Sequence, residues 1–173
     1  MTFPIVLLIL ALVALILIFS GVWPTIFGAP WVPTRMALVH KMMELAEVGP
    51  GDIVVDLGCA DGRILVTAAR NYGARAIGIE IEPLKFLWCQ LLITVLGLRK
   101  QVAVKLGNFH NHDLSESTVV ICYLLKETNQ HLMNKLKKEL SPGACVVSNT
   151  FTFPRMKPVK ESDDILLYLF NGE

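Results

Sequence analysis

The feature that most constrains the fold is a strand–turn–helix pattern at residues 53–63. An apolar, β-branched run ends in Asp56 and leads into a turn with small residues at positions 58, 60 and 62. A helical pattern begins near Arg63. Small residues in such a turn let the backbone come very close to a ligand. The pattern therefore favours an α/β fold with a ligand site at the end of its first strand.

Strands and helices alternate along the rest of the chain. The apolar patterns predict strands at residues 53–56, 76–80, 102–106, 118–124 and 144–148, and helices at about 62–72, 83–96 and 127–140. This alternation predicts a Rossmann-like, doubly wound, mostly parallel sheet. Two short strands at 159–161 and 165–170 would close it with a C-terminal antiparallel hairpin, to give seven strands. Thr34 is a candidate N-cap for a further helix before the sheet.

The N-terminus is apolar. Residues 5–23 carry no charge, and Arg35 is the first charged residue. At about 1.5 Å per residue this run would form a helix of roughly 28 Å, long enough to span a bilayer. A cleaved signal peptide is the alternative, but a basic n-region and an Ala-x-Ala site are both missing. We expect a transmembrane anchor at residues 1–27, a Pro-rich linker at 28–34 and a catalytic domain at 35–173.

Charge predicts how this domain is placed and what it binds. Arg35 and Lys41 follow the apolar run, which favours a single-pass membrane protein with its domain on the cytoplasmic side. Because 16 basic and 15 acidic side chains nearly cancel, we expect no broad basic face for nucleic acid.

Cysteine and histidine give little support to a metal site. The four cysteines stand in apolar contexts without a CxxC pair, so we expect buried free thiols: Cys59, Cys89, Cys122 and Cys145. Residues 110–113 read His-Asn-His-Asp. Adjacent loop residues rarely converge on one ion without further ligands, so we expect a solvated loop and no metal.

The turn after the first strand fits one nucleoside cofactor better than others. A dinucleotide fingerprint needs a glycine at its sixth position, where this chain has Arg63. S-adenosylmethionine has no pyrophosphate and suits this turn better. Glu80, at the end of the second strand, would accept hydrogen bonds from both ribose hydroxyls. Asp56 would hold the loop and the cationic amino-acid end of the cofactor. The other cofactor contacts that we expect in the turn are Gly58, Ala60, Asp61 and Gly62.

Further candidates follow the later strands. Asn108 would accept from the adenine amino group, although an ordinary Asx turn also explains this residue, and Phe109 would cover the ring. Tyr123, Asn149 and Thr34 are the candidates for shaping a substrate channel. For the aromatic residues, plain packing is the alternative.

The motif order DLGCADGR, GIEIEP, GNF, VVICYLL and SPGACVVSNTF resembles the class I, seven-β-strand methyltransferases. From Pro30 onward the chain is similar to small membrane-anchored protein-lysine methyltransferases of the mitochondrial ADP/ATP carrier and the ATP synthase c-subunit, and to their prokaryotic relatives. The resemblance implies methyl transfer from S-adenosylmethionine to a lysine of a membrane-associated protein. Ala60 stands where this motif usually has its second glycine, and alanine should be tolerated there if its φ is negative.

Two other functions remain open at this point. The same anchor would serve a methyltransferase of a lipid-phase small molecule, such as a quinone or an isoprenoid precursor. A cofactor-binding sensor or assembly factor without catalysis is the other. After the fourth strand the chain reads Tyr-Leu-Leu, without the Asn-Pro-Pro-Tyr of enzymes that act on planar amides and adenines.

Overall fold

The computed structural model describes residues 4–12, 14–15, 18 and 32–170. Residues 4–12 and 14–15 are helical. Within the described residues, no helix is both long and apolar enough to cross a membrane. The span predicted at residues 5–23 and the linker predicted at 28–34 both extend outside this part of the chain.

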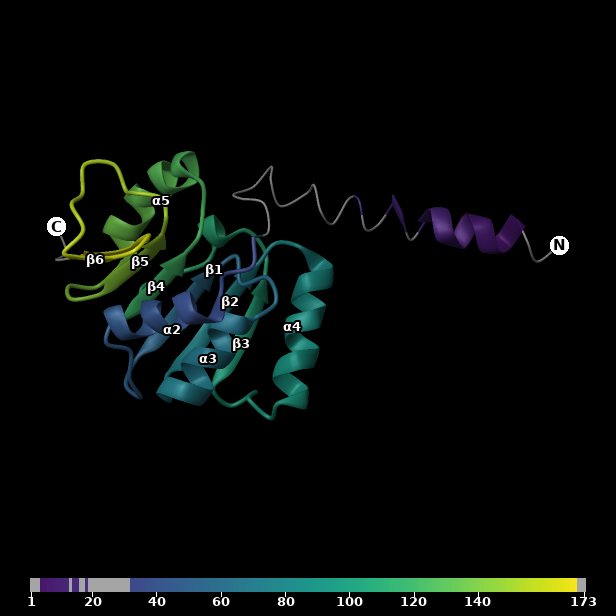
Figure 1. The fold of residues 1–173 in the computed structure, drawn as a ribbon, viewed down its shortest axis with the longest axis horizontal. Helices are drawn as coiled ribbons and strands as arrows, with labels where there is room; N and C mark the ends of the chain where they lie inside the picture. Colours follow the sequence, from purple (N-terminus) through teal and green to yellow (C-terminus); the bar gives the residue numbers. More distant parts are fainter. Residues whose placement is uncertain (1–3, 13, 16–17, 19–31, 171–173) are drawn as a thin grey trace.

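From residue 36 onward, helices and strands alternate as predicted (Figure 1). The elements are α2 (Met36–Leu45), β1 (Ile53–Leu57), α3 (Arg63–Tyr72), β2 (Arg75–Glu80), α4 (Pro83–Val95), β3 (Val102–Leu106), the 3-10 helix η1 (Phe109–Asn111), β4 (Val119–Cys122), α5 (Lys126–Glu139), β5 (Cys145–Asn149), β6 (Lys160–Ser162) and β7 (Ile165–Leu169).

The strands form one seven-stranded sheet in the order β3-β2-β1-β4-β5-β7-β6. The first five strands of this order are parallel, and β7 pairs antiparallel with both β5 and β6. The predicted doubly wound sheet with a C-terminal antiparallel hairpin is therefore confirmed.

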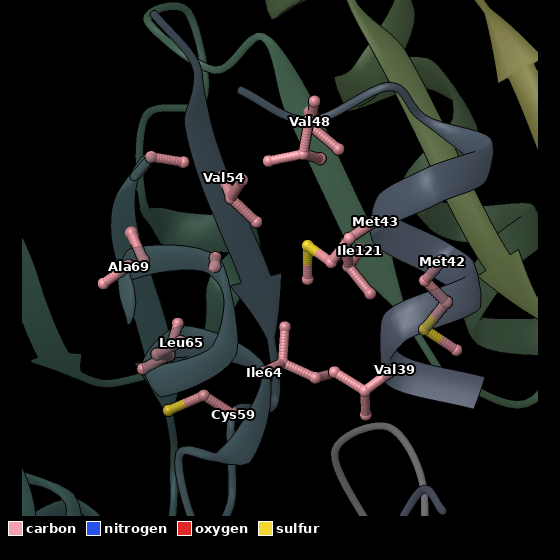
Figure 2. Packing of buried hydrophobic residues seen from close by; sticks show 14 of the residues in the cluster. Val39, Met42, Met43, Val48, Val54, Cys59, Ile64, Leu65, Ala69 and Ile121 are labelled. Atoms are coloured by element: carbon pink, nitrogen blue, oxygen red, sulfur yellow. The ribbon is translucent and has the colours of Figure 1, made fainter. Parts of the chain in front are cut away.

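Helices cover both faces of the sheet because the strands alternate their side chains between two cores. In β4, Val119 and Ile121 face the core beneath α2, α3 and α4. Val120 and Cys122 face the second core, beneath α5. Figure 2 shows the first core, where Val39 of α2 points toward Ile64 of α3.

Local details differ from the prediction, among them the start of α2 and the end of β4. The N-cap of α2 is Arg35, which makes no side-chain cap hydrogen bond, so the N-cap predicted at Thr34 is wrong. Thr34 instead presents its carbonyl oxygen to Arg63. Strand β4 ends at Cys122 and not at the predicted residue 124, and the two residues that follow it line a pocket. The four cysteines are buried free thiols, as predicted.

Close packing against β2 makes one glycine necessary. A Cβ atom at Gly78 would lie 2.5 Å from the Cys59 Sγ and 2.6 Å from the Leu65 Cδ1. We expect Gly78→Ala to lower the free energy of unfolding by about 1–3 kcal/mol, because overpacking displaces the β1 turn or α3. Chemical denaturation measures this change.

Gly51→Ala is the matched control. A Cβ atom at Gly51 would meet no atom within 4 Å. This substitution should leave stability unchanged or raise it slightly, since alanine reduces the entropy of the unfolded chain. Equal losses in the two variants would contradict the packing described here.

Candidate active site

A pocket opens at the carboxyl ends of the parallel strands, where doubly wound sheets bind their ligands. Four segments line it: the turn after β1, the end of β2, the residues that follow β3 and β4, and the segment before α2. The predicted residues in this lining are Thr34, Asp56, Gly58, Ala60, Asp61, Glu80, Asn108, Phe109 and Tyr123. The fold therefore gathers nine of the predicted residues around one pocket.

Glu80 is buried at the end of β2, with 4% of its surface exposed. Its Oε2 accepts a hydrogen bond from the Ala60 N–H at 2.8 Å, and its Oε1 accepts from the Glu82 N–H at 2.9 Å. Each carboxylate oxygen has a second acceptor position. Glu80 is thus held in one orientation and keeps the capacity to accept two more hydrogen bonds, as the ribose role requires.

Asp56 is also buried, near the end of β1. Burial, together with the nearby charges of Glu80 and Asp61, raises the pKa of its carboxyl to about 8. Without a ligand, this carboxyl therefore holds its proton at neutral pH. A cationic group in the pocket would favour the ionised form.

The turn between β1 and α3 uses three left-handed residues. Gly58 and Gly62 have φ angles of 86° and 78°, and Ala60 has a φ of 46°. The condition for easy tolerance of alanine, a negative φ at Ala60, is therefore not met. Both peptide groups of Ala60 are held, because its N–H donates to Glu80 and its carbonyl oxygen accepts from the Cys89 thiol at 3.0 Å. A left-handed alanine costs roughly 1–2 kcal/mol.

Gly58 makes room for a ligand. Gly58 lines the pocket, and a Cβ atom added there would meet no atom within 4 Å. A side chain at this position would therefore occupy space that is open to a ligand. This fits the expected close approach of the backbone to a cofactor.

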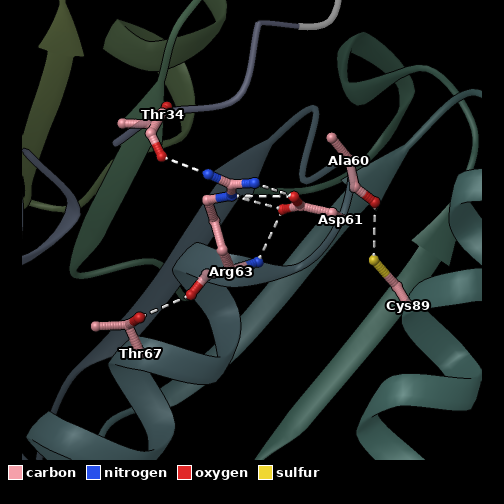
Figure 3. Close-up of polar contacts among 6 residues, drawn as sticks. All are labelled: Thr34, Ala60, Asp61, Arg63, Thr67 and Cys89. Carbon is pink, nitrogen blue, oxygen red and sulfur yellow. Dashed lines mark hydrogen bonds and ion pairs between the residues drawn. The ribbon is translucent and has the colours of Figure 1, made fainter. Parts of the chain in front are cut away.

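Arg63 joins the turn to the segment before α2, a role that the sequence analysis missed. Its Nε donates to Asp61 Oδ1 at 2.9 Å, and its Nη1 donates to the carbonyl oxygen of Thr34 at 2.6 Å. Figure 3 shows the guanidinium between these two partners. An acidic residue two positions before an arginine at a helix start was the available signal.

Three predicted site residues differ from the prediction in their position or in their contacts. Asn108 lines the pocket, but its Oδ1 accepts from the His110 N–H at 2.9 Å, so the Asx turn is confirmed and the contact to adenine stays a prediction. Gly62 is the N-cap of α3 and lies outside the pocket lining. Asn149 also lies outside it, because β5 is separated from β1 by β4 and Asn149 pairs with Ile165 of β7.

The structure adds further residues that were not predicted. Lys85, in the first turn of α4, lines the pocket. Glu82 precedes it and caps α4, accepting from the N–H groups of Leu84 and Lys85 at 3.0 and 2.8 Å. The sequence signal for this cap was a polar residue directly before Pro83.

Thiol and metal chemistry find no support in the site. Cys59 lines the pocket, but its hydrogen bond with Cys89 and its burial raise its pKa well above the usual value. A protonated thiol is a poor nucleophile. Across the described residues, no three His, Cys, Asp or Glu side chains are grouped to hold a metal ion.

Ala60 offers a direct test of strain in this turn. We expect Ala60→Gly to leave the stability unchanged or to raise it by up to about 1 kcal/mol, because relief of the left-handed strain exceeds or offsets the extra entropy of glycine. Ala37→Gly, on an exposed position of α2, should instead cost about 1 kcal/mol. Denaturation curves measure both, and equal destabilisation would contradict the strain.

Known proteins resemble this chain in sequence and in structure. Residues 56–160 match the family described as ANTKMT methyltransferase domain. A protein-lysine N-methyltransferase of Saccharolobus islandicus is 42% identical over 130 residues, which cover 75% of this chain and 81% of that protein. The mouse adenine nucleotide translocase lysine N-methyltransferase is 33% identical over 79% of this chain, which spans 59% of that relative.

A crystal structure from Salinibacter ruber, described as an RNA methyltransferase in complex with S-adenosylhomocysteine, has a TM-score of 0.80 and 38% sequence identity. The match covers 82% of this chain and 95% of that one. Family, relatives and fold agree on a methyltransferase domain. The chain therefore belongs to the ANTKMT family of S-adenosylmethionine-dependent lysine methyltransferases, and its Rossmann-like domain is a methyltransferase domain.

Proposed function

We propose that this protein transfers a methyl group from S-adenosylmethionine to a lysine side chain of a membrane-associated protein. The observation that carries the proposal is the pair of buried carboxylates, Asp56 and Glu80, at the ends of adjacent strands beside one pocket. Lysine is the target named for the relatives, and their names include a translocase and an ATP synthase subunit.

The residues of the pocket fit this cofactor. When bound, S-adenosylmethionine supplies an electrophilic methyl group on a sulfonium sulfur. Glu80 offers acceptors for two ribose hydroxyls, and ionised Asp56 offers a negative charge to the cationic amino-acid end. Gly58 leaves space for the backbone to approach, and Phe109 presents an aromatic ring to the adenine.

The lysine amine must reach the methyl group without its proton. Its ordinary pKa is about 10.4, and removal from water lowers this value. Val32, Pro33 and Leu124 line the pocket with apolar groups, and Tyr123 adds an aromatic one. In our proposal these side chains exclude water from the amine, while Thr34 and Tyr123 orient it. The amine then forms the new N–C bond, the S–C bond breaks, and the methylated ammonium releases a proton to solvent.

Attachment to a bilayer is part of the proposal. It rests on the uncharged N-terminal run and on the first charges at Arg35 and Lys41. An anchor within residues 1–27, with the domain on the cytoplasmic side, would raise the effective concentration of membrane-embedded substrates. Positioning of this kind matters because methyl transfer needs little covalent assistance from the protein.

Two other classes of substrate are distinguished by the labelling experiment described below. The first is a lipid-phase small molecule, which the same anchored domain could reach. An RNA substrate is suggested by the description of the Salinibacter structure. The nearly equal numbers of basic and acidic side chains speak against RNA.

Asp56 makes cofactor binding dependent on pH. Its pKa is about 8 without ligand, and binding of a cation favours the ionised form, so binding releases a proton. Affinity for S-adenosylmethionine should therefore rise by up to about tenfold per pH unit below pH 8 and level off above it. Calorimetry in buffers of different ionisation enthalpy counts the released protons.

Asp56→Asn is the control for this titration. It removes the carboxyl, so the binding should be weaker and the part of the proton release that belongs to Asp56 should vanish. Identical proton release in the two proteins would show that Asp56 does not ionise on binding.

Methyl transfer is tested with S-adenosylmethionine labelled in its methyl group. The purified chain is incubated with a membrane fraction, and the label is separated into protein, organic extract and RNA. We expect label on a lysine of a membrane protein, identified by mass spectrometry. Glu80→Gln should lower the incorporation at least about tenfold, because a carboxylate contact to the cofactor is lost.

Glu161→Gln is the matched control, since Glu161 is exposed on β6 at the far edge of the sheet. It should transfer label at the rate of the unmodified chain. Label found only in the organic extract or only in RNA would overturn the lysine proposal.

A further inference from the structure

Helix α4 exposes an unusually apolar face. Five residues at spacings of three and four follow one side of the helix: Leu84, Leu87, Trp88, Leu91 and Val95, with 43%, 60%, 55%, 58% and 73% of their surfaces exposed. We call this set the α4 stripe. On the other side of the helix, Cys89 and Ile93 are buried in the core below. Contiguous exposed apolar surface of this kind marks an interaction site.

The charged residues in α4 and directly after it have one sign. Between Pro83 and Gln101 the sequence contains no Asp or Glu, and its basic residues are Lys85, Arg99 and Lys100. Arg99 and Lys100 are exposed just beyond the end of α4. Glu82, before the helix, is buried and accepts hydrogen bonds from the first turn. An apolar face bordered by cations complements a bilayer with anionic headgroups.

The α4 stripe begins beside the active-site pocket. Leu84 is its first residue, and both Ile81 and Lys85 line the pocket. Figure 1 shows α4 along the β3 edge of the sheet, away from β6 and β7. A partner that covered α4 would therefore lie next to the part of the pocket that is lined by Glu80 and Ile81.

From these observations we infer that α4 lies on the surface of an anionic bilayer. The α4 stripe enters the boundary between headgroups and acyl chains, and Arg99 and Lys100 contact lipid phosphates. Trp88, in the middle of the stripe, has the amphipathic ring that is enriched at this depth. The 34 uncharged residues that precede Arg35 supply a second apolar contact to the same bilayer. This inference rests on the membrane attachment proposed above and not on the chemistry of methyl transfer.

The test uses the full chain with Trp88 as its only tryptophan. Of the three tryptophans, Trp23 and Trp31 are replaced by phenylalanine, and the protein is reconstituted into vesicles of phosphatidylcholine and phosphatidylglycerol. We expect a blue-shifted Trp88 emission, protection from aqueous acrylamide, and quenching by lipids brominated near the headgroup. The quenching should not change with the protein-to-lipid ratio. Leu91→Glu, at an exposed position, should reverse the shift.

The matched control moves the reporter to the opposite edge of the sheet. In a chain with Trp88→Phe and Val159→Trp, the new tryptophan replaces an exposed valine next to β6. Its emission should stay that of a water-exposed ring. Because the fold is unchanged, this variant separates contact by α4 from a general approach of the domain to the vesicle.

Three results would overturn the inference. In the first, the protein floats with the vesicles but acrylamide quenches Trp88. The proposed anchor would then be supported, and α4 would not lie in the bilayer. Trp88 that is protected from acrylamide but not quenched by brominated lipid would mean that a second copy or the chain's own N-terminal segment covers the stripe. Failure to float with vesicles would overturn the proposed attachment as well, whereas the labelling experiment above tests the chemistry separately.

Discussion

The site depends on the two hydrogen bonds that Glu80 accepts from backbone N–H groups. One bond, from Ala60, fixes the turn after β1, and the other, from Glu82, fixes the chain where α4 begins. Both partners are backbone N–H groups, and the Cys89 thiol holds the carbonyl oxygen of Ala60 on the other side. Charge-assisted hydrogen bonds of this kind are about twice as strong as neutral ones. One carboxylate therefore both holds the turn and lines the pocket.

Two residues that line the pocket, Asp56 and Ala60, lower the stability of the folded protein. Asp56 is buried with a raised pKa, so the unliganded protein loses stability as the pH rises from about 4 to about 8, the range in which only the unfolded chain gives up this proton. Ala60 adopts a left-handed backbone conformation that disfavours a side chain. Strained and poorly solvated groups concentrate at functional sites because the surrounding fold holds them in place.

Much of the fold could be predicted from the periodicity of the sequence, since apolar strands and helices alternate from residue 53 to β5, except that only the short 3-10 helix η1 lies between β3 and β4. Eight of the nine pocket residues lie at or just after strand ends, and they were also predictable because the ends of parallel strands converge on one edge of the sheet. The φ of Ala60, the true N-cap of α2 and the position of Asn149 were not. Each depends on a contact between distant segments: Ala60 with Cys89, Arg63 with Thr34, and Asn149 with β7. The exposure of the α4 stripe could not be predicted either, because the sequence of an apolar helix does not show which of its faces other elements cover.

The most direct test of this account is a crystal structure of the chain with S-adenosylhomocysteine. The account predicts that both ribose hydroxyls lie within about 2.6–3.2 Å of the Glu80 carboxylate oxygens, with the amino-acid end of the ligand beside Asp56 and Gly58. A ligand bound with its ribose away from Glu80, so that this carboxylate contacts only the backbone of Ala60 and Glu82, would contradict it.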